Sequence, residues 1–177
     1  MTKKLIEYEV IPLQGVGPVK LGMSRKQVHS ILGKKPEVDG STEYYHRNGL
    51  KIEYSEDQTV VFIEVSRDCG LVAIYQGKDV FNVKASKLID FVCQSSRYDE
   101  DDEEFGYTFI FPELDLSFWR PVIPESDDEP EGQYFYTIGI GQKEYFRDGD
   151  EAAMASKKLA TLKRPFKRTI GEGYVNR

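Results

Sequence analysis

The sequence has few of the residues on which catalytic and metal centres are usually built: two histidines, two cysteines and one tryptophan among 177 residues. Two cysteines, Cys69 and Cys93, cannot form a disulfide framework, which favours a reducing compartment. The N-terminal residues lack the apolar stretch of a signal peptide, and no segment is long and apolar enough to span a membrane. We therefore expect a cytoplasmic protein that does not insert into a membrane.

The histidines and cysteines also lack the spacing of an active site or a metal site. His29 is expected at an exposed helix position and His46 at the end of a strand, and neither cysteine has a base nearby in sequence. Cys93 is expected to be a small core residue, whereas Asp68 should raise the pKa of the Cys69 thiol. There is no Cys-x₂-Cys or His-x₃-His pair, and the acidic runs lack the ligand spacing of an EF-hand. We predict no enzymatic activity, no catalytic residues, no metal site and no cofactor.

The clearest local pattern is a short helix whose two ends are both marked in the sequence. Ser24 and Gln27 have the spacing of a capping box, in which each side chain bonds the other residue's backbone amide. Gly33 is placed to end the helix in a left-handed conformation. The residues between them include one predicted apolar stripe, formed by Val28, Ile31 and Leu32.

Strand patterns surround this helix and then recur after a second one. Before the first helix, Leu5–Leu13 predicts a strand and residues 15–18 a loop. After it, three strands are predicted at Thr42–His46, Leu50–Tyr54 and Thr59–Val65, the first two joined by a type I′ turn at Asn48-Gly49. The second half predicts a strand at Leu71–Tyr75, a helix at Val83–Gln94, and strands at Tyr107–Phe111, Leu114–Trp119 and Tyr134–Ile140.

This order of elements predicts an α+β protein built from two similar halves. Each half is a helix followed by an antiparallel meander, and the two meanders are expected to form one joined sheet. A further helix is predicted at Glu151–Leu162, before a basic tail. The predicted units are therefore residues 1–68, residues 69–146, and the C-terminal helix with its tail, residues 147–177.

The segment PVKLGMSRKQVHSILGKKP, from Pro18 to Pro36, resembles the helix opening of the SmpA/OmlA family of small lipoproteins. Two such units in tandem resemble the architecture of β-lactamase inhibitory protein, and the resemblance covers residues 18–65 closely and residues 80–140 in outline. The lipoprotein role requires a signal peptide and a lipidated cysteine, which this sequence lacks, so it is not implied here. Small soluble bacterial proteins with this opening are similar to immunity proteins, which implies a protein that neutralises a toxin.

The negative charge of the chain is concentrated in one segment. The whole chain has a formal net charge of -6, but residues 95–131 hold 13 acidic residues against Arg97 and Arg120, a net charge of -11. A chain of this charge is a poor candidate for nucleic-acid binding, which depends on neutralising phosphates. The acidic segment is either a solvated loop or a docking surface for a basic protein, because charge complementarity steers association.

We expect the chain to be a non-catalytic, cytoplasmic immunity protein that blocks a basic cognate toxin by occlusion, with a nuclease as the favoured class of toxin. The alternative is a small-ligand-binding or structural module. In the first interpretation the acidic residues steer association, while aromatic residues and an arginine supply the buried contacts. The predicted partner-binding residues are Asp99, Glu100, Asp101, Asp102, Glu103, Glu104, Tyr107, Trp119, Arg120, Asp127, Asp128, Glu129 and Tyr134.

Overall fold

The computed structural model describes residues 5–33, 35–126 and 129–147, which belong to one unit ending at Arg147. Within these residues the fold is α+β, with two helices and two β-sheets, which confirms the predicted fold class at this level. The helix predicted at Glu151–Leu162 lies outside the described residues. The elements are β1 (Ile6–Ile11), β2 (Gly15–Val16), β3 (Val19–Lys20), α1 (Arg25–Leu32), β4 (Glu37–Asp39), β5 (Thr42–Tyr45), β6 (Leu50–Tyr54), β7 (Val60–Ser66), β8 (Leu71–Tyr75), β9 (Lys78–Asp79), α2 (Ala85–Val92), β10 (Thr108–Phe111), β11 (Leu116–Trp119) and β12 (Thr137–Gly141).

The larger sheet contains seven antiparallel strands in the order β10-β11-β12-β7-β6-β5-β4. The strands that follow α2 join those that follow α1 through the pairing of β12 with β7, in which Ile140 lies opposite Ile63. Alternate residues of these strands therefore point to the same face of the sheet. The division into units 1–68 and 69–146 stays a prediction.

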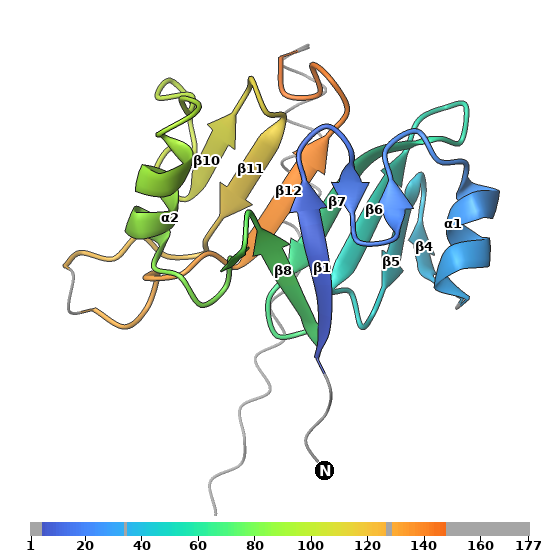
Figure 1. Cartoon of the computed structure of the whole chain (residues 1–177), viewed down its shortest axis with the longest axis horizontal. Coiled ribbons are helices and arrows are strands. Elements are labelled where there is room, and N and C mark those ends of the chain that lie inside the picture. The colour runs from blue at the N-terminus through green and yellow to red at the C-terminus, as the bar shows by residue number, and fades with distance from the viewer. Residues whose placement is uncertain (1–4, 34, 127–128, 148–177) are drawn as a thin grey trace, which may run out of the picture. The chain divides into compact units, whose positions relative to one another are not determined.

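A second sheet, which the sequence analysis did not foresee, has five strands in the order β3-β2-β1-β8-β9. Its centre is a parallel pair, β1 with β8, in which Ile6 lies opposite Leu71. Figure 1 shows this sheet lying across the middle of the seven-stranded sheet, with α1 beside one end and α2 beside the other. The two strands that precede the helices thus pair with each other and do not extend the larger sheet, so the prediction of one joined sheet was incomplete.

The core lies between the two sheets and under the helices. Val28 of α1, Leu88 of α2 and Ile52 of β6 are fully buried in the same cluster. The capping box of α1 is confirmed, since Ser24 and Gln27 bond each other's backbone amides, and Gly33 ends the helix with a φ of 60°. Burial of these side chains supplies most of the driving force for holding the layers together.

Several local predictions were wrong in detail. In α1 only Val28 is fully buried and Leu32 is partly buried against the core, whereas Ile31 is 44% exposed, so the predicted apolar stripe faces the core only in part. Cys93 ends α2 and is exposed, so it is not a core residue. The predicted type I′ turn at Asn48-Gly49 is instead a longer loop with positive φ at His46, Arg47 and Asn48. The predicted strands Leu114–Trp119 and Tyr134–Ile140 begin later, at Leu116 and Thr137.

The face of the larger sheet that points away from the smaller sheet carries an aromatic cluster at its centre. Phe62 covers Gly139 of the neighbouring strand and stacks on Tyr145 at a centroid distance of 4.8 Å. Tyr145 in turn covers Gly141 and donates a hydrogen bond to Glu53 at 2.8 Å. The absence of a side chain at these two glycines leaves room for both rings, so the residues that follow β12 are fixed against this face.

Candidate functional site

The first acidic segment, residues 99–104, connects α2 to the edge strand β10. The backbone amide of Asp99 bonds the carbonyl of Ile110 in β10 at 2.8 Å, which places the segment beside this strand. Three of its carboxylates bond within the segment or to the start of β10. Asp99 accepts from the amide of Asp101 (3.0 Å), Asp102 from the amide of Glu104 (2.7 Å), and Glu104 from the hydroxyl of Thr108 (2.9 Å). The exposed side chains are those of Asp99, Glu100, Asp101 and Glu103.

The second acidic segment, residues 121–133, follows β11. Glu129 accepts a hydrogen bond from the backbone amide of Glu125 at 2.6 Å, which closes a short turn. The side chain of Gln133 donates to the carbonyl of Ser126 at 3.1 Å. Glu125 and Glu131 are exposed, whereas Asp127 and Asp128 lie outside the described residues. The described part of this segment is therefore held by its own side chains and adds further negative charge.

Arg120 connects Gly106, two residues after the first acidic segment, with Gly132 in the second. Its Nε donates a hydrogen bond to the carbonyl of Gly106 at 2.8 Å, and its Nη1 donates one to the carbonyl of Gly132 at 2.9 Å. The guanidinium also lies 5.8 Å from the ring centre of Phe109 and 6.0 Å from that of Phe135. Burial lowers the pKa of Arg120, but arginine remains charged at any physiological pH. Arg120 thus fixes the loops on which the acidic residues stand, and its predicted contact with a partner stays a prediction.

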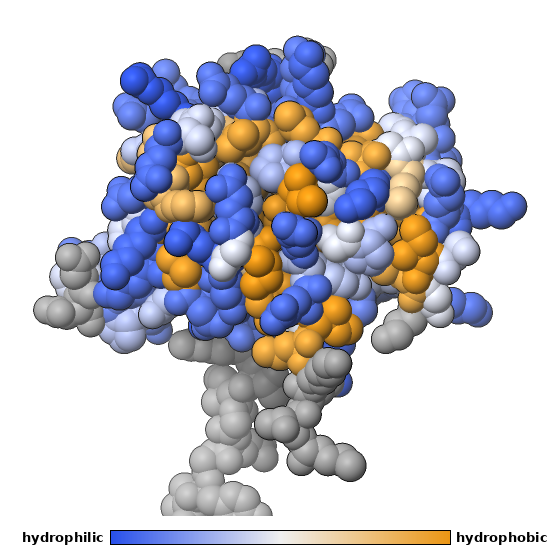
Figure 2. Space-filling view, in the orientation of Figure 1, coloured by the Kyte–Doolittle hydropathy of each residue, from blue (hydrophilic) through white to orange (hydrophobic). Residues whose placement is uncertain are grey.

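Three exposed apolar side chains accompany the acidic residues. Phe105 is 46% exposed, Tyr107 43% and Ile123 40%, and Ile123 packs directly on Gly106 between the first two. Figure 2 shows mostly hydrophilic side chains over the end of the unit that carries α2, with apolar side chains exposed among them. Sequence analysis identified Tyr107 but missed Phe105 and Ile123. The available signal was an apolar residue inside a charged loop, where no strand or helix pattern required one.

The other two predicted aromatic residues lie on or near the neighbouring strands. Trp119 ends β11 and is half-buried, with its ring edge-on to Tyr136 at a centroid distance of 6.1 Å. Tyr134 is half-buried, and the guanidinium of Arg67 lies 5.4 Å from the centre of its ring. Both therefore contribute less exposed surface than Tyr107, and their rings contact other residues of the chain.

A second cluster, also missed by sequence analysis, surrounds a buried carboxylate on β5. Glu43 is 1% exposed and accepts hydrogen bonds from Tyr45 (2.9 Å), Tyr54 (2.8 Å) and His29 of α1 (2.8 Å). Arg25 of α1 lies 3.4 Å from the same carboxylate. Burial alone would raise the pKa of Glu43, but the three hydrogen bonds outweigh it and the pKa is lowered. The two tyrosines have raised pKa values for the complementary reason, burial together with the Glu43 carboxylate.

This cluster places a histidine beside a carboxylate, which is one requirement of an acid–base site. The geometry favours a structural role, because each Glu43 oxygen already has two partners and the carboxylate is not exposed. The Glu43 cluster lies between α1 and the sheet, and its hydrogen bonds hold the short helix against β5 and β6. Among the residues that the structure describes, no group of three or more histidine, cysteine or acidic side chains is arranged to hold a metal ion.

Replacing Arg120 with lysine is expected to loosen both acidic segments at once. Lysine keeps the positive charge but lacks the planar fork that reaches two carbonyls in different directions. Losing both bonds should cost about 1–3 kcal/mol of stability. Hydrogen exchange should become faster in residues 99–107 and in residues 121–133. The control is Arg97→Lys, an exposed arginine beside the first segment, and faster exchange in only one segment would contradict the bridging role.

Comparisons of this chain with protein-family models, with curated proteins and with solved structures give no match. No helix in the described part of the chain is both long and apolar enough to span a membrane. The interpretation of the site therefore depends on the geometry and charge described above.

Proposed function

We propose that this chain is a non-catalytic immunity-type protein of the cytoplasm that binds a basic toxin and blocks it by occlusion. The observation that carries the proposal is the Arg120 bridge, which combines two acidic segments into one surface. A toxin that acts on nucleic acid needs a positively charged surface to bind phosphates, so a nuclease is the favoured class of partner. An acidic surface of fixed shape would compete for that same positive surface.

The composition of the surface supports a protein partner more than a simple solvated loop. Interface cores favour aromatic and apolar side chains, while surrounding charges steer the encounter. Here Phe105, Tyr107 and Ile123 are each at least 40% exposed among acidic residues, although one side of the Phe105 ring also packs on Tyr98 and Phe109. The proposed contact surface, named the acidic surface below, consists of Asp99, Glu100, Asp101, Glu103, Phe105, Tyr107, Ile123, Glu125, Glu129 and Glu131.

The same proposal includes the origin of the fold from two tandem halves of the SmpA/OmlA type. Its support is the order of elements, because α1 precedes β4–β7, α2 precedes β10–β12, and β12 continues the sheet from β7. In this view the first half supplies the buried helix-to-sheet cluster around Glu43. The second half has replaced such polar packing with aromatic residues and carries the partner surface.

The test uses the product of the gene next to the one that encodes this chain, where the toxin of an immunity protein is expected, purified and mixed with this chain. We expect a stable complex and rescue of toxin-expressing cells. The double variant Phe105→Ser/Tyr107→Ser should weaken binding at least about 30-fold, the loss typical of interface hot spots. Val38→Ser, which changes a 57% exposed apolar residue on β4, is the matched control and should bind normally. Failure of the unchanged chain to bind or to protect would disprove the proposal.

A further inference from the structure

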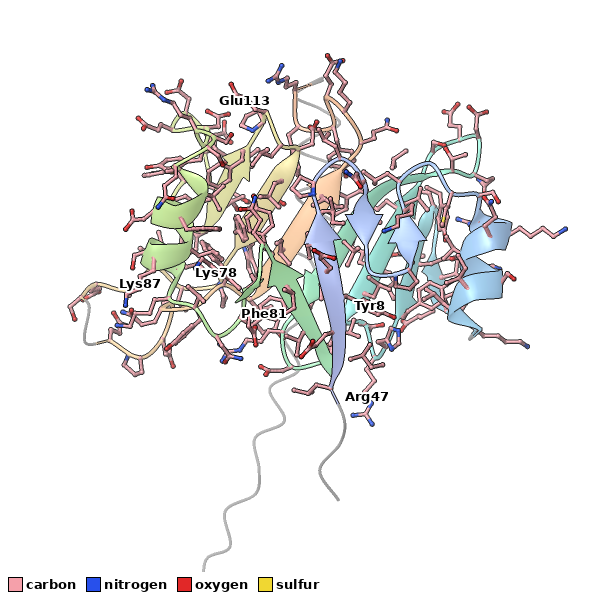
Figure 3. The ribbon with its side chains drawn as sticks, in the orientation of Figure 1. Tyr8, Arg47, Lys78, Phe81, Lys87 and Glu113 are labelled. Atoms are coloured by element: carbon pink, nitrogen blue, oxygen red, sulfur yellow. The ribbon has the colours of Figure 1, made fainter. Side chains whose placement is uncertain are left out.

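Two hollows that share a wall lie at the end of the unit where β1 begins. One has a volume of about 540 Å³ and the other about 390 Å³, and Arg47, Cys69 and Gly70 line both. Figure 3 shows Arg47 beyond the strand ends, below Tyr8 and Phe81. Each volume falls within the range of small-molecule sites. The two hollows, called the Arg47 groove below, include no residue of the acidic surface.

The backbone around Arg47 has a conformation that side-chain-bearing residues rarely adopt. His46, Arg47 and Asn48 have φ angles of 50°, 58° and 67° in the loop between β5 and β6. Each such residue costs on the order of 1 kcal/mol, and strain of this kind clusters at binding and catalytic sites. Gly49 packs against the side chain of Cys69 so closely that it has no room for a Cβ atom. The loop is therefore fixed against the Cys69 turn, and Arg47 is held between the two hollows.

Within the described residues Arg47 forms no ion pair, whereas two acidic residues that line the smaller hollow already have partners of their own. Asp68 lies 3.8 Å from Arg67, and Asp79 accepts from the Phe81 amide at 3.1 Å and from Asn82 at 2.6 Å. The larger hollow adds a second cation, Lys35, and one carboxylate, Glu37. An available guanidinium at the junction of two hollows favours carboxylate and phosphate oxygens, which it binds with two parallel hydrogen bonds.

The apolar part of each wall suits the body of a small organic molecule. Ile6, Tyr44 and Tyr45 line the larger hollow, and Leu5, Leu71 and Phe81 line the smaller one. Ligand sites typically combine such apolar walls with a few polar groups that fix orientation. We propose that the Arg47 groove binds a small organic oxyanion, with its phosphate or carboxylate on Arg47 and its apolar or aromatic body in the larger hollow.

The direct test is a titration with phenyl phosphate, followed by the backbone amide NMR signals of the full chain. We expect shifts centred on residues 46–48 and 69–70, whereas phenol, which lacks the anion, should shift them little. Arg47→Gln should weaken binding about tenfold or more, the loss expected for a charged hydrogen-bonded contact. Lys143→Gln removes an exposed cation that lines neither hollow and should bind normally. Equal binding of phenol, or unchanged binding by Arg47→Gln, would overturn the proposal.

The two free cysteines allow an independent measurement in the same molecule. Cys69 lines both hollows, whereas Cys93 lines neither and is exposed at the end of α2. Phenyl phosphate should slow the alkylation of Cys69 by iodoacetamide and leave that of Cys93 unchanged, as read by mass spectrometry. Equal rates with and without the ligand at Cys69 would count against the site. Because no toxin is involved, this outcome does not depend on the proposed protein partner.

Discussion

Replacing Glu43 with glutamine is expected to destabilise the fold by about 3–5 kcal/mol, the cost of removing one partner from a buried charged cluster. Glu43 is 1% exposed and is the common partner of His29, Tyr45 and Tyr54. A glutamine amide keeps the size of the side chain but replaces one acceptor oxygen with a donor. Arg25, 3.4 Å from the carboxylate, would also lose its counter-charge. Urea denaturation at neutral pH measures the loss.

The pH dependence of the same variant provides a second readout. The pKa of folded Glu43 is lowered, so its carboxylate contributes stability that is complete above the unfolded pKa of about 4.3. That contribution is lost as the pH falls through the lowered folded value. The difference in unfolding free energy between the wild type and Glu43→Gln should therefore shrink as the pH falls below about 4.

The control is Glu56→Gln, which removes the same charge from an exposed turn. Surface changes of this kind usually alter stability by less than about 0.5 kcal/mol. A Glu43→Gln variant as stable as this control would show that the cluster contributes no net stability. A difference from the wild type that persists unchanged to pH 3 would show that the carboxylate is not the group responsible.

Sequence analysis predicted well the parts of the fold that depend on residues close together in the sequence. Ser24 and Gln27 are three residues apart and form the capping box, and the strand predicted at Leu71–Tyr75 has the same bounds in the structure. The loop at residues 46–48 was missed because an Asn-Gly pair favours a two-residue turn, whereas contact of Gly49 with Cys69 selects a longer one. The parallel pairing of β1 with β8 joins residues 65 positions apart, such as Ile6 and Leu71, which periodicity does not reveal.

The functional sites were predicted less completely, because they too bring together residues that are far apart in the sequence. The acidic residues were visible as a charge run, but their union into one surface depends on Arg120 reaching two carbonyls, one on each side of it in sequence. The Glu43 cluster draws on α1, β5 and β6, and although Tyr45 is two residues from Glu43, no local pattern connects this strand with His29 or Tyr54. Convergence of polar groups from separate elements is a property of tertiary packing, so only the structure identifies it.

Removing charge from the acidic surface is expected to slow association with the basic partner about 10–100-fold at low salt, with a much smaller change in dissociation. The best variant is Glu100→Gln/Asp101→Asn/Glu103→Gln, because these three side chains are exposed and the carboxylates that accept hydrogen bonds in the segment are those of Asp99, Asp102 and Glu104. Asp102 and Glu104 are kept, since they bond the Glu104 amide and Thr108 and their loss would disturb the loop. The triple variant therefore lowers the negative charge of the acidic surface and leaves the hydrogen bonds that fix the loop in place.

Stopped-flow association rates across a series of salt concentrations test this electrostatic role. The wild type should lose its rate advantage as salt screens the charges, and the triple variant should show a flatter dependence. The matched control, Asp39→Asn/Glu56→Gln/Asp57→Asn, removes three exposed charges from β4 and the β6–β7 turn and changes net charge equally. If both triple variants slow association by the same factor, overall charge is responsible. Only a larger effect at residues 100, 101 and 103 assigns the steering to the acidic surface.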